Sequence, residues 1–144
     1  MIEEKFMKEY LPLTVIKIDK GVGSFITINL KDNIQNKKFY LWIYLTDWEI
    51  IDIDSKKVLL NSDNISDLYY KTIFQKFIGT TLNQVFIIEQ GYLEFVFDNK
   101  LKIVLMSNLN YYDLEDDLFM FFDNYQNIII SYSIKNNIYI EMNN

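Results

Sequence analysis

Apolar residues recur at every second position over much of this chain, and that spacing restricts its fold more than any other feature. In YLEFVFDNKLKIVLM (92–106) the alternation runs on both sides of Asp98-Asn99-Lys100. A period of two places successive side chains on opposite faces of a strand, so the segment predicts a β-hairpin that turns at 98–100. SFITINL (24–30) predicts another strand, and NIIISYS (127–133) with NIYIE (137–141) predicts a second hairpin.

Two segments are apolar at every position: FYLWIYL (39–45) and LFMFF (118–122). Such runs indicate strands that are buried on both faces, or strands that pack one face in a core and the other against a helix or a partner. We favour burial on both faces for 118–122. TDWEIIDID (46–54) alternates again, which predicts a strand with one wet face and favours a core position for Trp48 over a ligand-stacking one.

One helix is predicted, at about residues 64–78. Asn64 is a candidate N-cap, Asp67 follows three residues later as in a capping box, and Gly79 suits the position just beyond the last turn. A buried stripe with i, i+4 spacing is expected from Ile65, Tyr69, Ile73 and Phe77. Residues 1–12 are expected to form a short helix or a flexible lead-in.

These elements predict a single α+β domain over residues 1–144. Its centre is a mainly antiparallel β-sheet of about seven to nine strands, crossed by the one helix. A chain of 144 residues can bury a core of its own, and it has no internal repeat or Pro/Gly/Ser-rich linker.

The chain contains no Cys, His or Arg. Disulfides, thiolate nucleophiles, His-based triads and the usual zinc sites are therefore excluded, as are guanidinium clamps for phosphate. We assign no catalytic, cofactor-binding or metal-binding residue and predict that the protein is not an enzyme. An enzyme that works through carboxylates, Lys and Tyr is the last-ranked alternative.

The net charge is −6. A negative protein repels nucleic acid and anionic membranes, so neither is an expected partner, and a basic protein is. The N-terminal residues MIEEKFMKEY have no apolar core of a secretory signal, and the longest apolar run has seven residues. A cytoplasmic location is therefore expected.

The segment YYDLEDDLFMFFDN (111–124) holds the densest group of acids. No Lys occurs between Ile103 and Ile134, although the chain has 14 basic residues. One interpretation is a surface for a basic partner, and another is a solvated turn before a strand. A Ca²⁺ loop does not fit, because the central Gly and the final bidentate Glu are missing. The candidate partner-binding residues are Tyr111, Tyr112, Asp113, Glu115, Asp116, Asp117 and Asp123.

Three stretches resemble a family of small uncharacterised bacterial proteins: GSFITINL (23–30), LWIYLTDWEI (41–50), and SNLNYYDLEDDLFMFFDN (107–124) running on to ISYSIKNNIYIE (130–141). Proteins of this kind are similar to the immunity proteins found beside polymorphic toxin genes, and the family has no catalytic motif to transfer. The resemblance implies a binding protein that neutralises a toxin domain.

Charge, missing catalytic residues and resemblance together predict a non-enzymatic, cytoplasmic immunity protein. Its acidic loop would occlude the basic surface of a toxin domain. The alternative is a structural domain that forms a homodimer or larger oligomer by burying FYLWIYL or LFMFF against a copy of itself.

Overall fold

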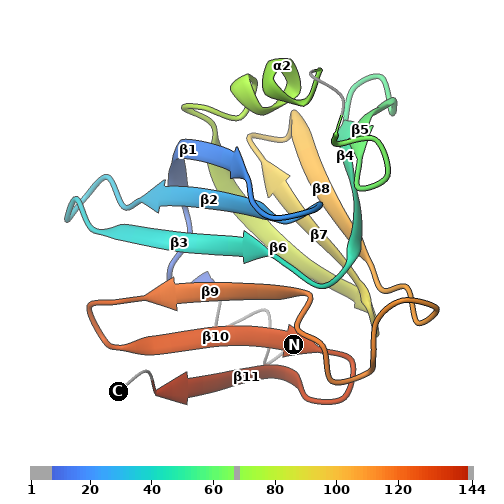
Figure 1. The fold of residues 1–144 in the computed structure, drawn as a ribbon. Coiled ribbons are helices and arrows are strands. Elements are labelled where there is room, and N and C mark those ends of the chain that lie inside the picture. Colours follow the sequence, from blue (N-terminus) through green and yellow to red (C-terminus); the bar gives the residue numbers. More distant parts are fainter. Residues whose placement is uncertain (1–7, 67–68, 143–144) are drawn as a thin grey trace.

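One antiparallel sheet dominates the computed structural model, which describes residues 8–66 and 69–142 (Figure 1). Its strands are β1 (Leu13–Lys20), β2 (Ile26–Lys31), β3 (Lys38–Ile43), β4 (Asp47–Asp52), β5 (Val58–Asn61), β6 (Thr81–Glu89), β7 (Tyr92–Phe97), β8 (Leu101–Met106), β9 (Phe119–Asp123), β10 (Ile128–Ser133) and β11 (Asn137–Met142). Helix α2 covers Tyr70–Gln75. In the described part of the chain, no helix has the length and apolar character needed to cross a membrane.

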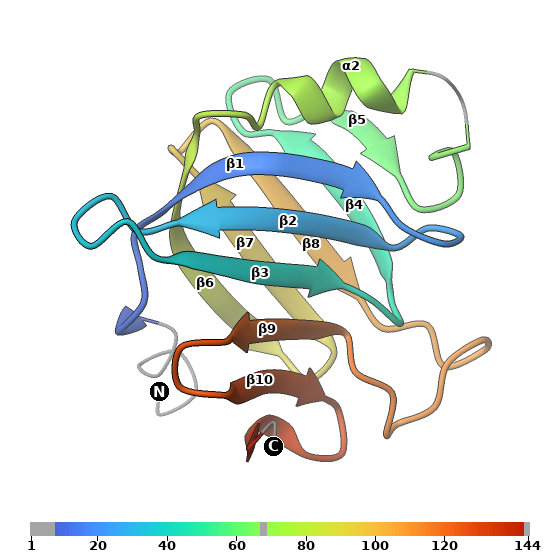
Figure 2. The ribbon, with the colours of Figure 1, turned by 60° about the vertical axis from the view of Figure 1, so that its left-hand side comes forward.

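The sheet folds back on itself to make two layers. The strand order is β11-β10-β9-β3-β2-β1-β6-β7-β8-β4-β5, and the bend falls where β1 meets β6. Only two residue pairs join these strands, Leu13 with Leu82 and Thr14 with Thr81. Figures 1 and 2 show β6, β7 and β8 crossing behind β1, β2 and β3, with α2 over one end. This arrangement buries one face of each layer against the other.

The core lies between the layers and is rich in aromatic rings. Phe95 of β7 and Phe119 of β9 meet edge to face across it, with ring centroids 5.3 Å apart. Trp48 is fully buried, as the alternation around it predicted, and its indole Nε1 donates to the backbone oxygen of Ser24 over 2.7 Å. Burying one large apolar side chain contributes about 1.5–3 kcal/mol, so these rings supply much of the stability.

Both predicted hairpins are confirmed. Strands β7 and β8 join through Asp98 and Asn99, whose φ angles of 55° and 54° are those of a type I′ turn. Asp and Asn reach this left-handed region more easily than other side chains do. Strands β10 and β11 pair from Ile128 with Met142 to Ser133 with Asn137.

The predicted helix at 64–78 is too long. Among the described residues of this range, 70–75 are α-helical, and the N-cap is Tyr69, which makes no side-chain capping bond. Asn64 does not cap the helix: its Oδ1 accepts a 2.8 Å bond from the Asn61 amide in the turn after β5. Local side-chain bonds of this kind compete with helix formation. Asp67 lies outside the described residues. So do residues 1–7 of the short helix or flexible lead-in expected at 1–12, and residues 9–12 of it are turn and irregular chain.

At the other end of α2, i→i+3 bonds carry the chain through residues 76–80 in place of α-helical ones. Gly79 adopts the left-handed conformation that was expected, with φ of 84°. Ile73 and Phe77 are buried as predicted, whereas Tyr69 is exposed, because residues 65 and 69 do not share one helix.

The sheet has more strands than the seven to nine predicted, because β1, β5 and β6 lie in segments that showed no strict alternation. Burial of 118–122 on both faces is also wrong. In β9 the side chains of Met120 and Phe122 lie on the outer face and are half-buried, and in β3 Trp42 is 40% exposed. The outer face of this layer therefore carries aromatic side chains that no described element covers.

Candidate functional site

The candidate site is the loop between β8 and β9, residues 107–117, which we name the acidic loop. Backbone bonds hold it at both ends. Ser107 N donates to Gly91 O over 2.8 Å, and Leu118 N donates to Tyr132 O over 2.8 Å. In the middle, Lys135 N donates to Leu114 O over 2.9 Å. The loop therefore has a defined shape on the β10–β11 side of the molecule.

Short-range bonds also order the acids themselves. Asp113 N donates to Asp116 Oδ2 over 2.8 Å, and Asp116 N donates back to Asp113 O over 3.2 Å. One carboxylate of the cluster thus fixes the backbone of another acid. In the described part of the chain, no group of three or more acids is close enough together to hold a metal ion.

The two tyrosines of the loop have different surroundings. Tyr111 is 81% exposed and projects into solvent. Tyr112 is half-buried, and its side chain is hydrogen-bonded to that of Ser24. Burial, and then the negative charge of Asp47, raise the pKa of Tyr112. Tyr112 therefore attaches the loop to the β1–β2 turn, and Tyr111 remains free for contact.

The carboxylates differ in the same way. Glu115 forms an exposed ion pair with Lys135, with Nζ and Oε1 2.7 Å apart, and this lysine holds the pKa of Glu115 below its usual value. The stretch without Lys in the sequence thus meets a lysine from the β10–β11 turn. Asp117 accepts a 2.6 Å bond from the Tyr139 hydroxyl. Burial raises the pKa of Asp117, and the bond from Tyr139 opposes that rise.

Asp123 lies apart from the other candidate residues. It sits at the far end of β9 with 2% of its surface exposed. Its carboxylate accepts bonds from the Tyr10 hydroxyl and the Gln126 side chain, both over 2.9 Å. The backbone amides of Tyr125 and Gln126 also donate to it. This carboxylate holds the β9–β10 turn and is not available to a partner.

The structure adds residues to the site that the sequence did not indicate. Asp47 accepts a 2.9 Å bond from Asn108 Nδ2, which places a further acid beside the loop. Glu141 of β11 is exposed and close enough to Asp117 to raise its pKa. Leu109 and Leu114 expose apolar side chains on the loop. Strand pairing brings the two acids to the loop from distant segments, and linear spacing gave no sign of it.

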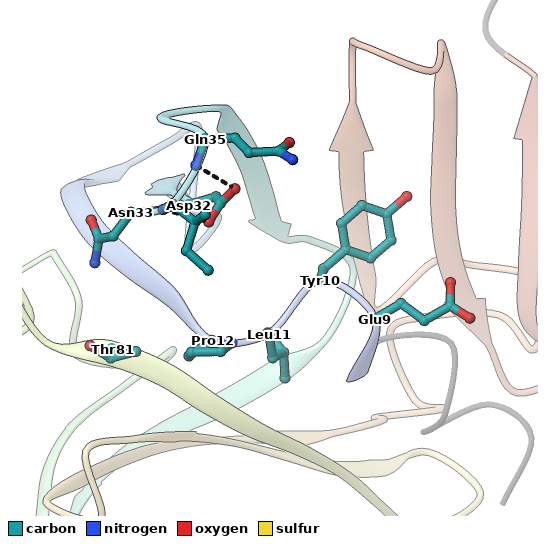
Figure 3. Close-up of a pocket in the computed structure, with 9 residues that line it drawn as sticks. Glu9, Tyr10, Leu11, Pro12, Asp32, Asn33, Gln35 and Thr81 are labelled. Carbon is teal, nitrogen blue, oxygen red and sulfur yellow. Dashed lines mark hydrogen bonds between the residues drawn. The ribbon is translucent and has the colours of Figure 1, made fainter.

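A separate pocket of about 360 Å³ lies between residues 9–12 and the β2–β3 turn (Figure 3). Its polar side chains do not converge: Asn33 and Gln35 point away from one another. The Asp32 carboxylate accepts bonds from the amides of Ile34 and Gln35, so it serves the turn. Asp117, the described carboxyl group with a raised pKa, does not line this pocket. Glu9 and Asp32 are the two acids that line the pocket, and the carboxylate of Asp32 is already bonded to the turn.

The comparisons return no relatives. No family model, no curated protein and no solved structure matches this chain.

Proposed function

We propose that the chain is a non-enzymatic binding protein that recognises a basic protein partner through the acidic loop. In its specific form the proposal is a cytoplasmic immunity protein that covers the basic surface of a toxin domain. The observation that carries it is the construction of the loop, which is ordered by backbone bonds and still presents Tyr111, Leu109 and Leu114 to solvent among carboxylates.

Charge supports the proposal. The surface includes Asp113, Asp116, Asp117 and Glu115 from the loop, with Asp47 and Glu141 beside them. Among the described residues, the single ion pair within this group joins Glu115 to Lys135. A surplus of negative charge attracts a basic partner and raises its association rate. At ~0.15 M salt the attraction extends over a Debye length of about 8 Å.

Apolar contact would supply most of the affinity. Exposed tyrosines are frequent anchors in protein interfaces, because they bury a large area and lose little side-chain entropy. Tyr111 suits that role, with Leu109 and Leu114 as neighbours. Rigidity of the loop reduces the entropy lost on binding. Occlusion of a basic substrate groove needs nothing beyond this contact, which is why the mechanism requires no catalytic group.

The test is calorimetry and stopped-flow association with the basic product of an adjacent reading frame. The variant is Asp113→Lys with Glu115→Lys, because both side chains are exposed and neither caps the backbone. We expect the association rate to fall on the order of tenfold or more at low salt. The wild-type rate should fall steeply as salt rises, and the variant rate should not.

The matched control is Asp54→Lys with Asp63→Lys, two exposed acids on turns outside the acidic loop. It changes the net charge by the same amount. If both double variants slow association equally, general attraction explains the effect and the acidic loop is not the binding surface. If no basic neighbour binds at all, the proposal as a whole fails.

A second candidate, self-association, is favoured by the edge strand β11. It ends the sheet order of the described residues, and Ile140 and Met142 are 48% and 64% exposed on it. Exposed edges can pair with a second copy. Sedimentation of the wild type and of Ile140→Lys distinguishes the two functions: a dimer that the variant dissociates supports self-association. The previously expected dimer strands β3 and β9 are both interior to the sheet.

A further inference from the structure

Three aromatic side chains lie close together on the outer face of the layer that contains β1, β2 and β3, beside the acidic loop. Antiparallel pairing places Ile26 opposite Ile43 and Thr27 opposite Trp42, and the same register brings Phe25 opposite Tyr44. Because alternate residues share a face, Trp42 and Tyr44 point the same way. The ring centroids of Phe25 and Tyr44 are 4.5 Å apart, and those of Trp42 and Tyr44 are 6.4 Å apart.

These rings line a surface pocket of about 250 Å³, together with Gly21, Val22 and Thr27. Its accessible wall is entirely apolar. The ring planes of Phe25 and Trp42 are tilted by 51° and 47° from that of Tyr44, so the rings do not stack flat on one another. Pockets for drug-sized ligands occupy roughly 300–1,000 Å³, so this one suits a single side-chain head group.

The pocket adjoins the acidic loop on two sides. Tyr44 N donates to Leu118 O over 2.9 Å, at the end of the loop. Ser24, which precedes Phe25, bonds to Tyr112 of the loop. On the same row of the sheet, Asp19 pairs with Thr27 and Thr27 pairs with Trp42. Lys17 is ion-paired to Asp19 over 3.3 Å, and Lys31 and Lys38 lie farther along the same face.

An apolar wall of aromatic rings that adjoins an acidic loop suits a cation more than an uncharged group, because ring faces carry partial negative charge. We propose that Phe25, Trp42 and Tyr44 form an aromatic cage for an arginine or lysine side chain of the basic partner. This inference rests on the proposed function and names the contact that would anchor the partner. The acidic loop attracts the partner, and the cage holds one of its cationic head groups.

The test uses short peptides and does not need the partner. The probes are acetyl-Gly-Arg-Gly-amide, its lysine counterpart, and the same peptide with citrulline, which has nearly the shape of arginine without its charge. Binding is followed by NMR shifts of the Trp42 indole and by Trp fluorescence. We expect the arginine or lysine peptide to bind roughly two- to 30-fold more tightly than the citrulline peptide. Equal or tighter binding of citrulline, or no shift at Trp42, overturns the cage.

Trp42→Leu keeps an apolar side chain and removes the ring, so it should abolish the preference for the charged peptide. Tyr44→Leu is the second variant, in case the first does not fold. The matched control is Phe122→Leu, whose ring lies 4.8 Å from that of Trp42 and does not line the pocket. The control should keep the preference. If it loses the preference as fully as Trp42→Leu does, the cage is not the binding element.

The loop variant Asp113→Lys with Glu115→Lys separates this inference from the proposed function. Peptide shifts at Trp42 that persist in this variant support a cage with its own affinity. Peptide shifts that map to the acidic loop and leave Trp42 unmoved overturn the cage, while attraction of a basic partner by the loop still stands. Loss of partner binding with intact peptide binding overturns the loop function alone.

Discussion

The Tyr139 hydroxyl donates a 2.6 Å hydrogen bond to Asp117 Oδ1, which joins the edge strand β11 to the acidic loop. The two residues are 22 positions apart in the chain. Burial disfavours the charge on Asp117, and this bond offsets part of that cost. The position of the loop therefore depends on a strand that contributes little to the core.

Tyr139→Phe removes this bond and leaves the ring in place. We expect a loss of about 1–2 kcal/mol in the free energy of unfolding, as for a bond to a charged group that is partly exposed. The pKa of Asp117 should rise further, because the hydroxyl favours its ionised form. Urea denaturation and carboxyl NMR titration measure both effects. Tyr111→Phe, at an exposed site of the same loop, is the control and should change neither.

Asp117→Asn should raise the free energy of unfolding at neutral pH, whereas Tyr139→Phe should lower it. A carboxyl group whose folded pKa is raised binds its proton more tightly in the folded state. The free energy of unfolding therefore falls as pH rises from the pKa of the unfolded state, near 3.8, through the higher pKa of the folded state. Above the folded pKa the cost is complete. Asn carries no charge and avoids that cost.

Denaturation of wild type and Asp117→Asn at pH 3, 5 and 7 tests this sign. The variant should gain stability relative to wild type as pH rises, and the two should nearly coincide at the lowest pH. Asp113→Asn removes a charge from an exposed position of the loop and is the reference. A variant that is less stable than wild type at pH 7 would show that the Asp117 carboxylate is stabilising.

The sequence predicted the parts of the fold that depend on local chemistry. Alternation located β2, β7 and β8, and Asp98 with Asn99 defined the tight turn between β7 and β8. It did not give the length of α2, because an asparagine turn at 61–64 competes with the helix start. It also gave no means of placing β9 beside β3, since that pairing joins residues about 80 positions apart.

The candidate site was predicted in part for a related reason. Composition located the acids of the loop, but only contacts show which of them are free. Lys135, from outside the stretch that lacks lysine, is ion-paired to Glu115. The Asp123 carboxylate is hydrogen-bonded within the β9–β10 turn. Nothing in the sequence indicated that the aromatic residues at 25, 42 and 44 line one surface pocket, because a linear sequence does not say which face of a sheet is covered.

Asp123→Ala should be among the more destabilising single changes. It removes an acceptor for the Tyr10 hydroxyl, the Gln126 side chain and two backbone amides at a buried position. Tyr125 and Gln126 are exposed, so water can replace part of what their donors lose. A donor that water cannot reach costs about 1–3 kcal/mol, and a total of about 3 kcal/mol is expected. Asp123→Asn keeps one acceptor oxygen and should lose less. Partner binding by the folded fraction should be unchanged. Weaker binding would show that Asp123 belongs to the partner-binding surface.

Gly91 supports the base of the acidic loop, and Gly91→Ala should displace it. The residue has φ of 76°, and a Cβ there would meet Ser107 Cβ at 2.9 Å and Ile134 Cδ1 at 3.0 Å. Backbone strain and overpacking together should cost about 2–4 kcal/mol in unfolding free energy. Gly91 also accepts the bond from Ser107 N that begins the loop.

Gly23→Ala is the matched control for that variant. Gly23 has φ of 65°, and a Cβ there would meet no atom within 4 Å. The substitution adds backbone strain but no overpacking, so the free energy of unfolding should fall by about 1 kcal/mol. Thermal or urea unfolding gives the two stabilities, and amide NMR shifts across 107–117 show whether the loop has moved. Shifts in Gly91→Ala that are no larger than those in Gly23→Ala would show that the loop does not depend on close approach at Gly91.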